Sequence, residues 1–430
     1  MNTREYPALG ETLQETVLSN GLKILVARKP GFRKATAMFA ARYGGADRRF
    51  KLAGEWLDTP AGVAHYLEHK MFDMPDGRNV LGELSARGAN PNAFTGQGMT
   101  AYHITCTADV MESLRILLTY VSTPYYTAES VQKERGIISQ EIRMYENNPD
   151  AVVYYQLMAA LYAAHPIRET VAGTVESIGE ITAETLYHCH KVFYNPSNMT
   201  LVCVGDVDAE KIAALAEEIL SPERGETPER DYGPAEGPLP AAPKAERTMA
   251  VAAPIFYLGS KVDAPAEGPA RLRRRVLGEL ALDCLCGESS AFYADLYARG
   301  LLGRNFGAEL DDTAGAMTLI LGGESKDPAA VAEALQERLG TVARRGLDPN
   351  AFTRCRRARY GGELAALDSF GAYARSLIQG SFDGWNPLDL FPVLEELTAE
   401  EAAAFLCETL SPERIALSVV RPAQKEGGEA

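Results

Sequence analysis

Two histidines and a glutamate stand within five positions of one another in the segment AHYLEHKMF, residues 64–72. The whole chain of 430 residues has only six histidines. The surrounding pattern predicts a helix, and positions i and i+4 of a helix share one face. His65 and His69 can therefore bind one metal ion together. Glu68, between them, can reach a water molecule at that metal without binding the metal itself.

The string H-x-x-E-H in this segment is the inverted zincin motif. With 6 histidines and 58 acidic residues in 430 positions, chance produces the pattern roughly 0.01 times per chain. A catalytic zinc ion normally takes three protein ligands, so a third ligand, expected to be a carboxylate, must come from elsewhere in the chain. The ligand types indicate zinc and leave manganese and cobalt open.

The longer segment GVAHYLEHKMF resembles the pitrilysin, or inverzincin, family of zinc metallopeptidases, in particular its half-size members that are similar to mitochondrial processing peptidase. A glutamate far along the chain completes the metal site in that family, and another acidic residue lies seven positions before it. The segment KERGIISQEIRMYENNP, residues 133–149, matches this pattern. The resemblance therefore assigns Glu141 as the third zinc ligand. It assigns Glu134 as a supporting catalytic carboxylate that orients a ligating histidine.

A second matching segment is GANPNAFTGQGMTAY, residues 88–102, which resembles the family segment N-A-x-T. In the family a strand that ends in tyrosine follows this segment, and the resemblance implies that this strand is an exposed edge to which a peptide substrate adds, main chain to main chain. The implied substrate-binding residues are Asn92, Ala93, Phe94 and Thr95.

The second half of the chain departs from the family pattern. Family members often carry an arginine and a tyrosine there that contact the substrate near zinc. In residues 288–310, Tyr297 stands at the arginine position and Gly303 at the tyrosine position. Arg299, Arg304 or a partner subunit are the candidates to replace them. In half-size relatives two chains enclose a chamber, so the resemblance implies a homodimer or a heterodimer with an inactive homologue.

The remaining elements follow from hydrophobic periodicity and turn signals. Residues 16–28 predict a β-hairpin around Asn-Gly. Thr59 is expected to cap the first helix, with Pro60 at the first helical position. The segment rich in glycine, asparagine and proline before the strand at 99–106 is expected to form a turn. Further strands are predicted at 35–43, 99–106 and 198–207, and helices at about 60–72, 109–123, 127–146, 150–163, 183–193 and 209–220.

The domain organisation follows from length and from an internal repeat. A single core rarely exceeds ~250–300 residues, so two domains are expected. Residues 181–207 and 397–422 share the order T-A-E, amphipathic helix, short turn and apolar strand, which indicates a duplicated α+β domain. We expect each domain to contain a mainly antiparallel sheet packed with helices. The resemblance adds that the two domains form half of a clam-shaped peptidase.

Residues 221–247 separate the two copies. Proline, glycine and charged residues dominate this segment, which is typical of a linker. The predicted division is a zinc-binding catalytic domain at 1–222, a linker at 223–247 and a homologous domain without a metal site at 248–430.

The four other histidines all lie in the first half of the chain. We expect structural roles for His103, His188 and His190, and a surface or capping role for His165.

The bulk composition excludes several classes of protein. A formal net charge of −15 argues against a nucleic-acid binder. Seven scattered cysteines in a long chain argue against a disulfide framework and for a reducing compartment. We find neither a signal peptide nor a run of ~18 apolar residues. We therefore expect a cytoplasmic protein that binds neither nucleic acid nor membrane.

These patterns together predict a zinc-dependent endopeptidase that holds one zinc ion and hydrolyses peptides or small unfolded segments, with Glu68 as the general base. One alternative is a non-catalytic or weakly active zinc-binding subunit of a heteromeric peptidase-like complex. The presence of Glu68 argues against it, because a structural metal site needs no base. Another alternative is a metal-dependent hydrolase of non-peptide amides, against which the edge segment 90–102 argues.

Overall fold

A computed structural model describes residues 1–423 of the chain. The chain forms two compact units, and each contains segments from both halves of the sequence. The first unit comprises Met1–Ile142, Thr170–Tyr232 and Glu363–Leu388. The second comprises Arg143–Glu169, Gly233–Gly362 and the C-terminal segment from Asp389. The units therefore do not follow the linear division at 222 and 247.

The first unit is built on a seven-stranded sheet in the order β1-β2-β3-β9-β4-β8-β7. The β2–β3 pair is the predicted hairpin, antiparallel around Asn20-Gly21. All neighbouring strands are antiparallel except β3 and β9, which are parallel. The strands are β1 (Asn2–Tyr6), β2 (Glu11–Val17), β3 (Lys23–Arg28), β4 (Ala35–Ala41), β7 (Asn90–Thr95), β8 (Thr100–Cys106) and β9 (Met199–Gly205). A small sheet in the order β10-β5-β6 accompanies it, with β5 (Arg49–Leu52), β6 (Glu55–Asp58) and β10 (Glu229–Arg230).

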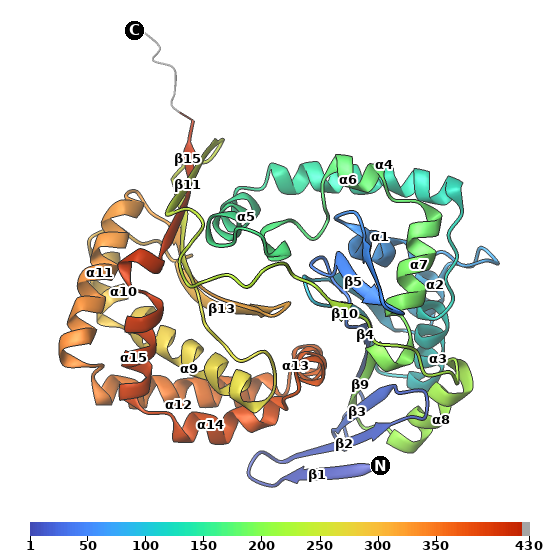
Figure 1. The fold of residues 1–430 in the computed structure, drawn as a ribbon. Helices are drawn as coiled ribbons and strands as arrows, with labels where there is room; N and C mark the ends of the chain where they lie inside the picture. The colour runs from blue at the N-terminus through green and yellow to red at the C-terminus, as the bar shows by residue number, and fades with distance from the viewer. Residues whose placement is uncertain (424–430) are drawn as a thin grey trace. The chain divides into compact units, whose positions relative to one another are not determined.

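Helices cover both faces of the large sheet, which explains why its central strands β4 and β9 are buried along their whole length. Every residue of β4 and β9 is buried. On one face, side chains such as Phe39 and Leu201 join the main core with α3 and its neighbours. On the other face, α13 packs on β4 and β9 although it comes from the far end of the sequence (Figure 1). The helices of this unit are α1 (Val63–Lys70), α2 (Val80–Ala86), α3 (Val110–Val121), α4 (Ala128–Glu146, whose last turn belongs to the second unit), α6 (Val175–Gly179), α7 (Ala183–Phe193), α8 (Ala209–Ile219) and α13 (Phe370–Asp383).

The second unit contains a five-stranded sheet in the order β11-β15-β12-β14-β13. Its pairing repeats that of β3-β9-β4-β8-β7: the first pair is parallel and the others are antiparallel. Thr182 and Thr398 form capping boxes at the starts of α7 and α15. Each helix is followed in the chain by a strand of the parallel pair, β9 after α7 and β15 after α15. The predicted duplication of an α+β domain is therefore confirmed. The strands are β11 (Lys244–Met249), β12 (Ile255–Lys261), β13 (Gly307–Thr313), β14 (Ala316–Glu324) and β15 (Ala416–Pro422).

One helix of the second unit comes from the first half of the sequence. α5 (Pro149–Leu161) packs on β12 and β15 and fills the core there with Leu157, Met158 and Leu161. Gly259 permits the close approach, since a Cβ at this position would lie 2.8 Å from a methyl group of Leu157. The other helices of the unit are α9 (Pro269–Cys286), α10 (Ala291–Ala298), α11 (Pro328–Arg345), α12 (Pro349–Ala366), α14 (Leu390–Glu396) and α15 (Ala399–Thr409). Short 3₁₀ turns lie at Pro166–Arg168, Pro196–Asn198, Pro387–Asp389 and Pro412–Arg414.

The segment expected to be a linker is tied down at several points. In the first unit, the buried carboxylate of Asp47 accepts hydrogen bonds from Arg230 at 3.0 Å and from Tyr232 at 2.9 Å. In the second unit, Glu236 accepts three backbone N–H groups of residues 163–165 at 2.8–2.9 Å. Composition alone predicted a plain linker because these partners are distant in sequence.

Two local expectations were wrong. The helix with the histidines begins after Gly62, which has φ 96° and serves as the N-cap, and not at Thr59-Pro60. A side chain at Gly62 would place its Cβ 2.5 Å from the carbonyl oxygen of Ala172. Residues 90–95 form the edge strand β7 and not a turn. The edge therefore lies at the N-A-x-T segment itself, and the strand after it, β8, lies between β4 and β7 inside the sheet. An edge strand tolerates Pro91 because one side of it needs no ladder donor.

Within residues 1–423, no helix combines the length and the apolar character needed to span a membrane.

Candidate active site

The helix α1 presents its two histidines and Glu68 from a rigid base. Val63, Ala64, Tyr66 and Leu67 are buried in the core of the first unit. The hydroxyl group of Tyr66 donates a hydrogen bond to the carbonyl oxygen of Val131 in α4. This bond ties α1 to α4, so the two helices hold a fixed relation to each other.

The helix α4 supplies the carboxylates. Val131, Ile138 and Ile142 form its buried stripe. Glu134 and Glu141 are seven residues apart, two turns, and lie together beside that stripe. Apolar burial of α4 therefore directs both carboxylates towards α1.

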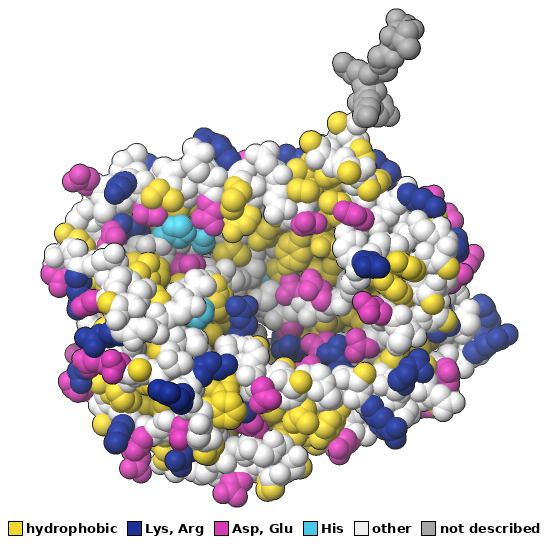
Figure 2. Space-filling model, turned by 180° about the vertical axis from the view of Figure 1, so that it is seen from behind, with side chains coloured by type: hydrophobic (Ala, Val, Ile, Leu, Met, Phe, Trp, Pro, Cys, Tyr) yellow, Lys and Arg dark blue, Asp and Glu magenta, His cyan; other side chains and the backbone are white. Residues whose placement is uncertain are grey.

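The side chains of His65, His69 and Glu141 converge. Glu141 Oε1 lies 3.6 Å from His65 Nε2, and Glu141 Oε2 lies 3.3 Å from His69 Nε2. The three donor atoms lie within 4.8 Å of one another, and no other group of this kind occurs in residues 1–423. Ligands of a tetrahedral zinc ion at ~2.0–2.1 Å are about 3.3 Å apart, so the two measured separations fit such an ion. Figure 2 shows histidine side chains at the surface with acidic side chains beside them.

Glu134 contacts the other nitrogen of one histidine. His69 Nδ1 lies 3.0 Å from Glu134 Oε1. Burial alone would lower the pKa of His69, but the hydrogen bond with Glu134 and the charge of Glu141 outweigh it and raise the pKa. The same hydrogen bond lowers the pKa of Glu134. A carboxylate in this place fixes the tautomer and makes the imidazole a stronger metal ligand.

His65 is held differently. Its Nδ1 is buried and has no hydrogen-bond partner among the described residues. Its ring packs against that of His69, with centroids 4.7 Å apart and planes at 64°. Packing therefore orients His65, whereas a hydrogen bond orients His69.

Glu68 is coupled to the edge strand. The hydroxyl group of Thr95 donates to Glu68 Oε2 at 2.6 Å. The hydroxyl group of Thr100 lies 3.4 Å from that of Thr95 and 2.9 Å from the carbonyl oxygen of Tyr43, which is buried. A chain of hydroxyl groups thus links Glu68 to the buried core. The N-A-x-T motif indicated Thr95, whereas Thr100 carried no signal in the sequence.

The contact between Thr95 and Glu68 predicts a graded loss of turnover. In Thr95→Val, a substitution of equal shape, kcat should fall about ten- to hundredfold, since a hydrogen bond to a charged group is worth ~1.5–3 kcal/mol. Thr95→Ser keeps the hydroxyl group and should retain most of the turnover. Steady-state kinetics should show the loss in kcat with little change in KM or in bound zinc. Equal kcat values for both variants and the wild type would contradict the positioning role.

The four residues of β7 that were expected to bind substrate lie on both faces of the seven-stranded sheet. Ala93 and Thr95 face the core and α1. Asn92 and Phe94 alternate with them and therefore face the opposite side of the sheet. There the guanidinium group of Arg375, from α13, lies 4.0 Å from the ring centroid of Phe94. No sequence pattern predicts this contact, because the two residues are 281 positions apart.

The other histidines lie outside the cluster. His165 caps a 3₁₀ turn, with Nδ1 accepting from the backbone N–H of Ile167, as the predicted capping role requires. The buried His190 donates through Nε2 to the carbonyl oxygen of Val121, and burial lowers its pKa to about 4. His188 lies near the ring of Phe50. His103 lies near Phe94.

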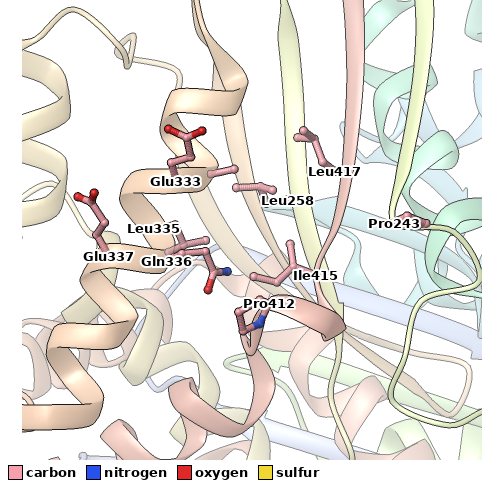
Figure 3. A pocket seen from close by; sticks show the side chains of 10 residues that line it. Pro243, Leu258, Glu333, Leu335, Gln336, Glu337, Pro412, Ile415 and Leu417 are labelled. Carbon is pink, nitrogen blue, oxygen red and sulfur yellow. The ribbon is translucent and has the colours of Figure 1, made fainter.

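The second unit contains no such metal-binding group within its described residues. Tyr297 is exposed on α10 and stacks on Tyr293. Arg299, a candidate replacement for the family arginine, pairs with Asp295 at 3.1 Å. A cavity of about 610 Å³ opens between α11 and the sheet, with apolar walls that include Leu258, Ile415 and Leu417 and with Glu333 and Glu337 at its rim (Figure 3).

Comparison with known proteins identifies the family. Residues 53–175 match the family model described as Insulinase (Peptidase family M16). Residues 180–359 match the model described as Peptidase M16 inactive domain. The chain is 35% identical over 427 residues to the uncharacterized zinc protease YmfH of Bacillus subtilis, which covers 97% of this chain and 98% of the relative. This chain belongs to the M16 family of zinc proteases. The predicted membership of the pitrilysin family is thereby confirmed.

Solved structures of the M16 family share the fold. The chain superposes on a putative M16-like peptidase from Alicyclobacillus acidocaldarius with a TM-score of 0.92 and 35% identity, covering 98% of this chain and all of that one. A protease from Helicobacter pylori gives a TM-score of 0.80 at 18% identity, covering 95% and 99% of the two chains, which shows the fold alone. The predicted two-domain α+β architecture is therefore confirmed.

Proposed function

We propose that this M16 chain is a zinc-dependent endopeptidase that hydrolyses peptides or small unfolded segments and holds one zinc ion through His65, His69 and Glu141. The observation that carries the proposal is the convergence of these three donor groups from two helices within 4.8 Å. The name of the Bacillus subtilis relative supports zinc as the metal. When bound, zinc polarises a carbonyl oxygen and lowers the pKa of a water molecule from ~15.7 towards ~7.

Glu68 is the proposed general base. It stands between the two histidines, and Thr95 holds its Oε2. Its Oε1 has no hydrogen bond within the part of the chain that the structure describes. Oε1 can therefore take the proton of the attacking water and pass it to the leaving nitrogen. General acid–base catalysis of this kind contributes ~10²–10⁴-fold to the rate.

The edge strand β7 is the proposed binding site for the peptide main chain. Pro91 lacks an N–H group, so it occupies a position that is not bonded to β8. Ala93 and Thr95 share its orientation and turn their backbone groups to the free edge. The side-chain oxygen of Asn92 accepts from the backbone N–H of Ala93 at 2.9 Å. A bound peptide would replace Asn92 at this donor and extend the sheet by one strand.

A second chain is part of the proposal. Tyr297 and Gly303 stand where the family resemblance implies an arginine and a tyrosine near the zinc. We propose a homodimer, or a heterodimer with an inactive homologue, whose other subunit supplies those contacts. Light scattering of the pure chain detects a homodimer, and light scattering of the chain mixed with a homologous protein detects a heterodimer. Seven cysteine thiols without a disulfide support a reducing, cytoplasmic setting, which cell fractionation checks.

The alternative is a non-catalytic or weakly active zinc-binding subunit of a heteromeric complex. Two observations favour it: residues 180–359 match a model described as an inactive domain, and the arginine–tyrosine pair is missing. Both observations concern the second half of the chain, whereas the cluster around Glu68 is complete.

A peptide-library digest tests the proposal. The purified chain should cleave extended peptides, lose this activity when a chelator removes zinc, and regain it when zinc is returned. The control is the same treatment followed by magnesium, which prefers oxygen ligands and should not restore cleavage. A metal-loaded chain that binds zinc but cleaves no peptide would favour the non-catalytic subunit instead.

A further inference from the structure

Arg375 is a cation without an anionic partner beside the edge strand. Its side chain is exposed, and within residues 1–423 it makes no hydrogen bond or ion pair to any carboxylate. Its guanidinium group lies 4.0 Å from the ring centroid of Phe94, and the ring of His103 lies 6.3 Å from that of Phe94. Burial and the nearby charge of Arg375 lower the pKa of His103.

Several other arginines of the first unit pair with carboxylates. Arg230 pairs with Asp47 at 3.0 Å, Arg49 pairs with Asp58 at 2.7 Å, and Arg115 pairs with Glu218 at 2.6 Å. Acidic residues outnumber basic ones by 58 to 43 in the chain. Arg375, next to the proposed peptide-binding edge, is thus a cation that no carboxylate of the described residues pairs with, in an acidic protein.

The stacking geometry leaves the donors of Arg375 free. A guanidinium group over an aromatic face uses its π surface for the stack, while its N–H groups point outward in its own plane. Those N–H groups match both oxygens of a carboxylate. The ring of Phe94 thus positions the guanidinium group of Arg375.

The register of a bound strand would bring side chains to this guanidinium group. Side chains of a strand that pairs with β7 alternate between the face of α1 and the face of Arg375. A side chain opposite Phe94 has its Cβ about 4.5–5.5 Å from that of Phe94. The peptide residue that lies opposite Phe94 is therefore adjacent in the peptide sequence to a residue that faces α1.

We propose that Arg375 and Phe94 form a subsite that binds a carboxylate of the peptide substrate. The inference rests on the proposed function, because it requires a peptide on β7. The carboxylate belongs either to an aspartate or glutamate side chain or to the C-terminus of the peptide. The subsite selects acidic peptides although the protein itself carries net negative charge.

Peptide binding to the full-length Glu68→Gln chain tests this subsite without turnover. The probes are fluorescein-labelled peptides that carry a single glutamate, placed at a different position in each peptide and with no other charged side chain. Fluorescence anisotropy gives the Kd of each peptide and of its twin, in which glutamine replaces that glutamate. At one position, the glutamate peptide should bind about three- to fivefold more tightly than its twin. The preference should disappear when salt rises from ~0.1 M to ~1 M, which shortens the screening length from ~10 to ~3 Å. A matched set with free and amidated C-termini distinguishes a terminal from a side-chain carboxylate.

The charge-reversed variant Arg375→Glu decides the role of the residue. It should abolish the preference for glutamate and favour lysine at the same position. The control is Lys34→Glu, which makes the same change of net charge at a cation that lies 4.4 Å from the ring centroid of Phe370 on the same helix. That variant should keep the preference for glutamate.

The failures of the two proposals are distinguishable. If the Glu68→Gln chain with and without Arg375→Glu shows the same ratio of Kd values for every pair of glutamate and glutamine peptides, the subsite is disproved. Peptide binding at β7 is then unaffected. If no extended peptide binds at all, the proposed edge strand site is overturned together with the subsite.

Discussion

Glu68→Gln should abolish peptide cleavage while the chain keeps its zinc. The amide is not a base, so the catalytic contribution of ~10²–10⁴-fold is lost. His65, His69 and Glu141 remain in place, and the amide oxygen still accepts the hydrogen bond from Thr95. Single-turnover kinetics with an extended peptide and metal analysis of the same sample measure both outcomes.

A matched control for this variant is Glu217→Gln. Glu217 is exposed on α8 and belongs to the same unit, so the change removes the same charge without touching the cluster. It should leave cleavage unchanged. Cleavage by Glu68→Gln at the rate of this control would disprove the assignment of the general base.

Glu141→Gln should have the second large effect, the loss of zinc. The substitution removes the negative charge that lies 3.3 Å from His69 Nε2 and 3.6 Å from His65 Nε2. Two neutral imidazoles then face the metal without a charged ligand, and zinc affinity should fall more than the ~10–100-fold typical of a lost hydrogen-bonding partner of a ligand. Competition with a chromogenic chelator measures the affinity.

Two variants on the same helix calibrate this result. Glu134→Gln keeps all three ligands and loses only the support at His69 Nδ1, so its zinc affinity should fall ~10–100-fold. Glu129→Gln changes an exposed residue in the first turn of α4 and should leave the affinity unchanged. If Glu141→Gln bound zinc as tightly as Glu129→Gln, Glu141 would not be a ligand.

The parts of the site that lie on single helices could be predicted from the sequence. The spacing of His65 and His69 placed both rings on one face, and the spacing of Glu134 and Glu141 did the same for the carboxylates. The burial of Val131 and Ile138 follows the same helical period. That α1 and α4 meet came from the resemblance, because no local pattern specifies which two helices will pack together.

The wrong expectations have physical causes. The pair Thr59-Pro60 looks like a helix start, but Gly62 must pass close to Ala172, and only its positive φ lets the helix begin there. The glycine- and proline-rich text around Pro91 looks like a turn, yet an edge strand needs no donor on its outer side. In both places a tertiary contact overruled a local preference.

The contact between Arg375 and Phe94 could not be predicted. Hydrophobic periodicity predicts which face of α13 is buried, and it does not predict which sheet that face covers. Because α13 packs on β4 and β9, a residue from the end of the chain lies beside a strand from its beginning. The same limit holds for α5, whose apolar residues gave no indication that they fill the core of the other unit.

Each of these two helices packs in the unit that is formed mainly by the other half of the sequence. This exchange affects how the protein resists cleavage by other proteases. A single cut in residues 233–243 would sever the backbone but free neither fragment. The N-terminal fragment would still be anchored through α5 in the sheet of its counterpart, and the C-terminal fragment would still be anchored through α13. The two fragments separate only when α5 leaves the core of the second unit and α13 leaves the core of the first. A molecule with this single cut therefore keeps the architecture of the intact chain.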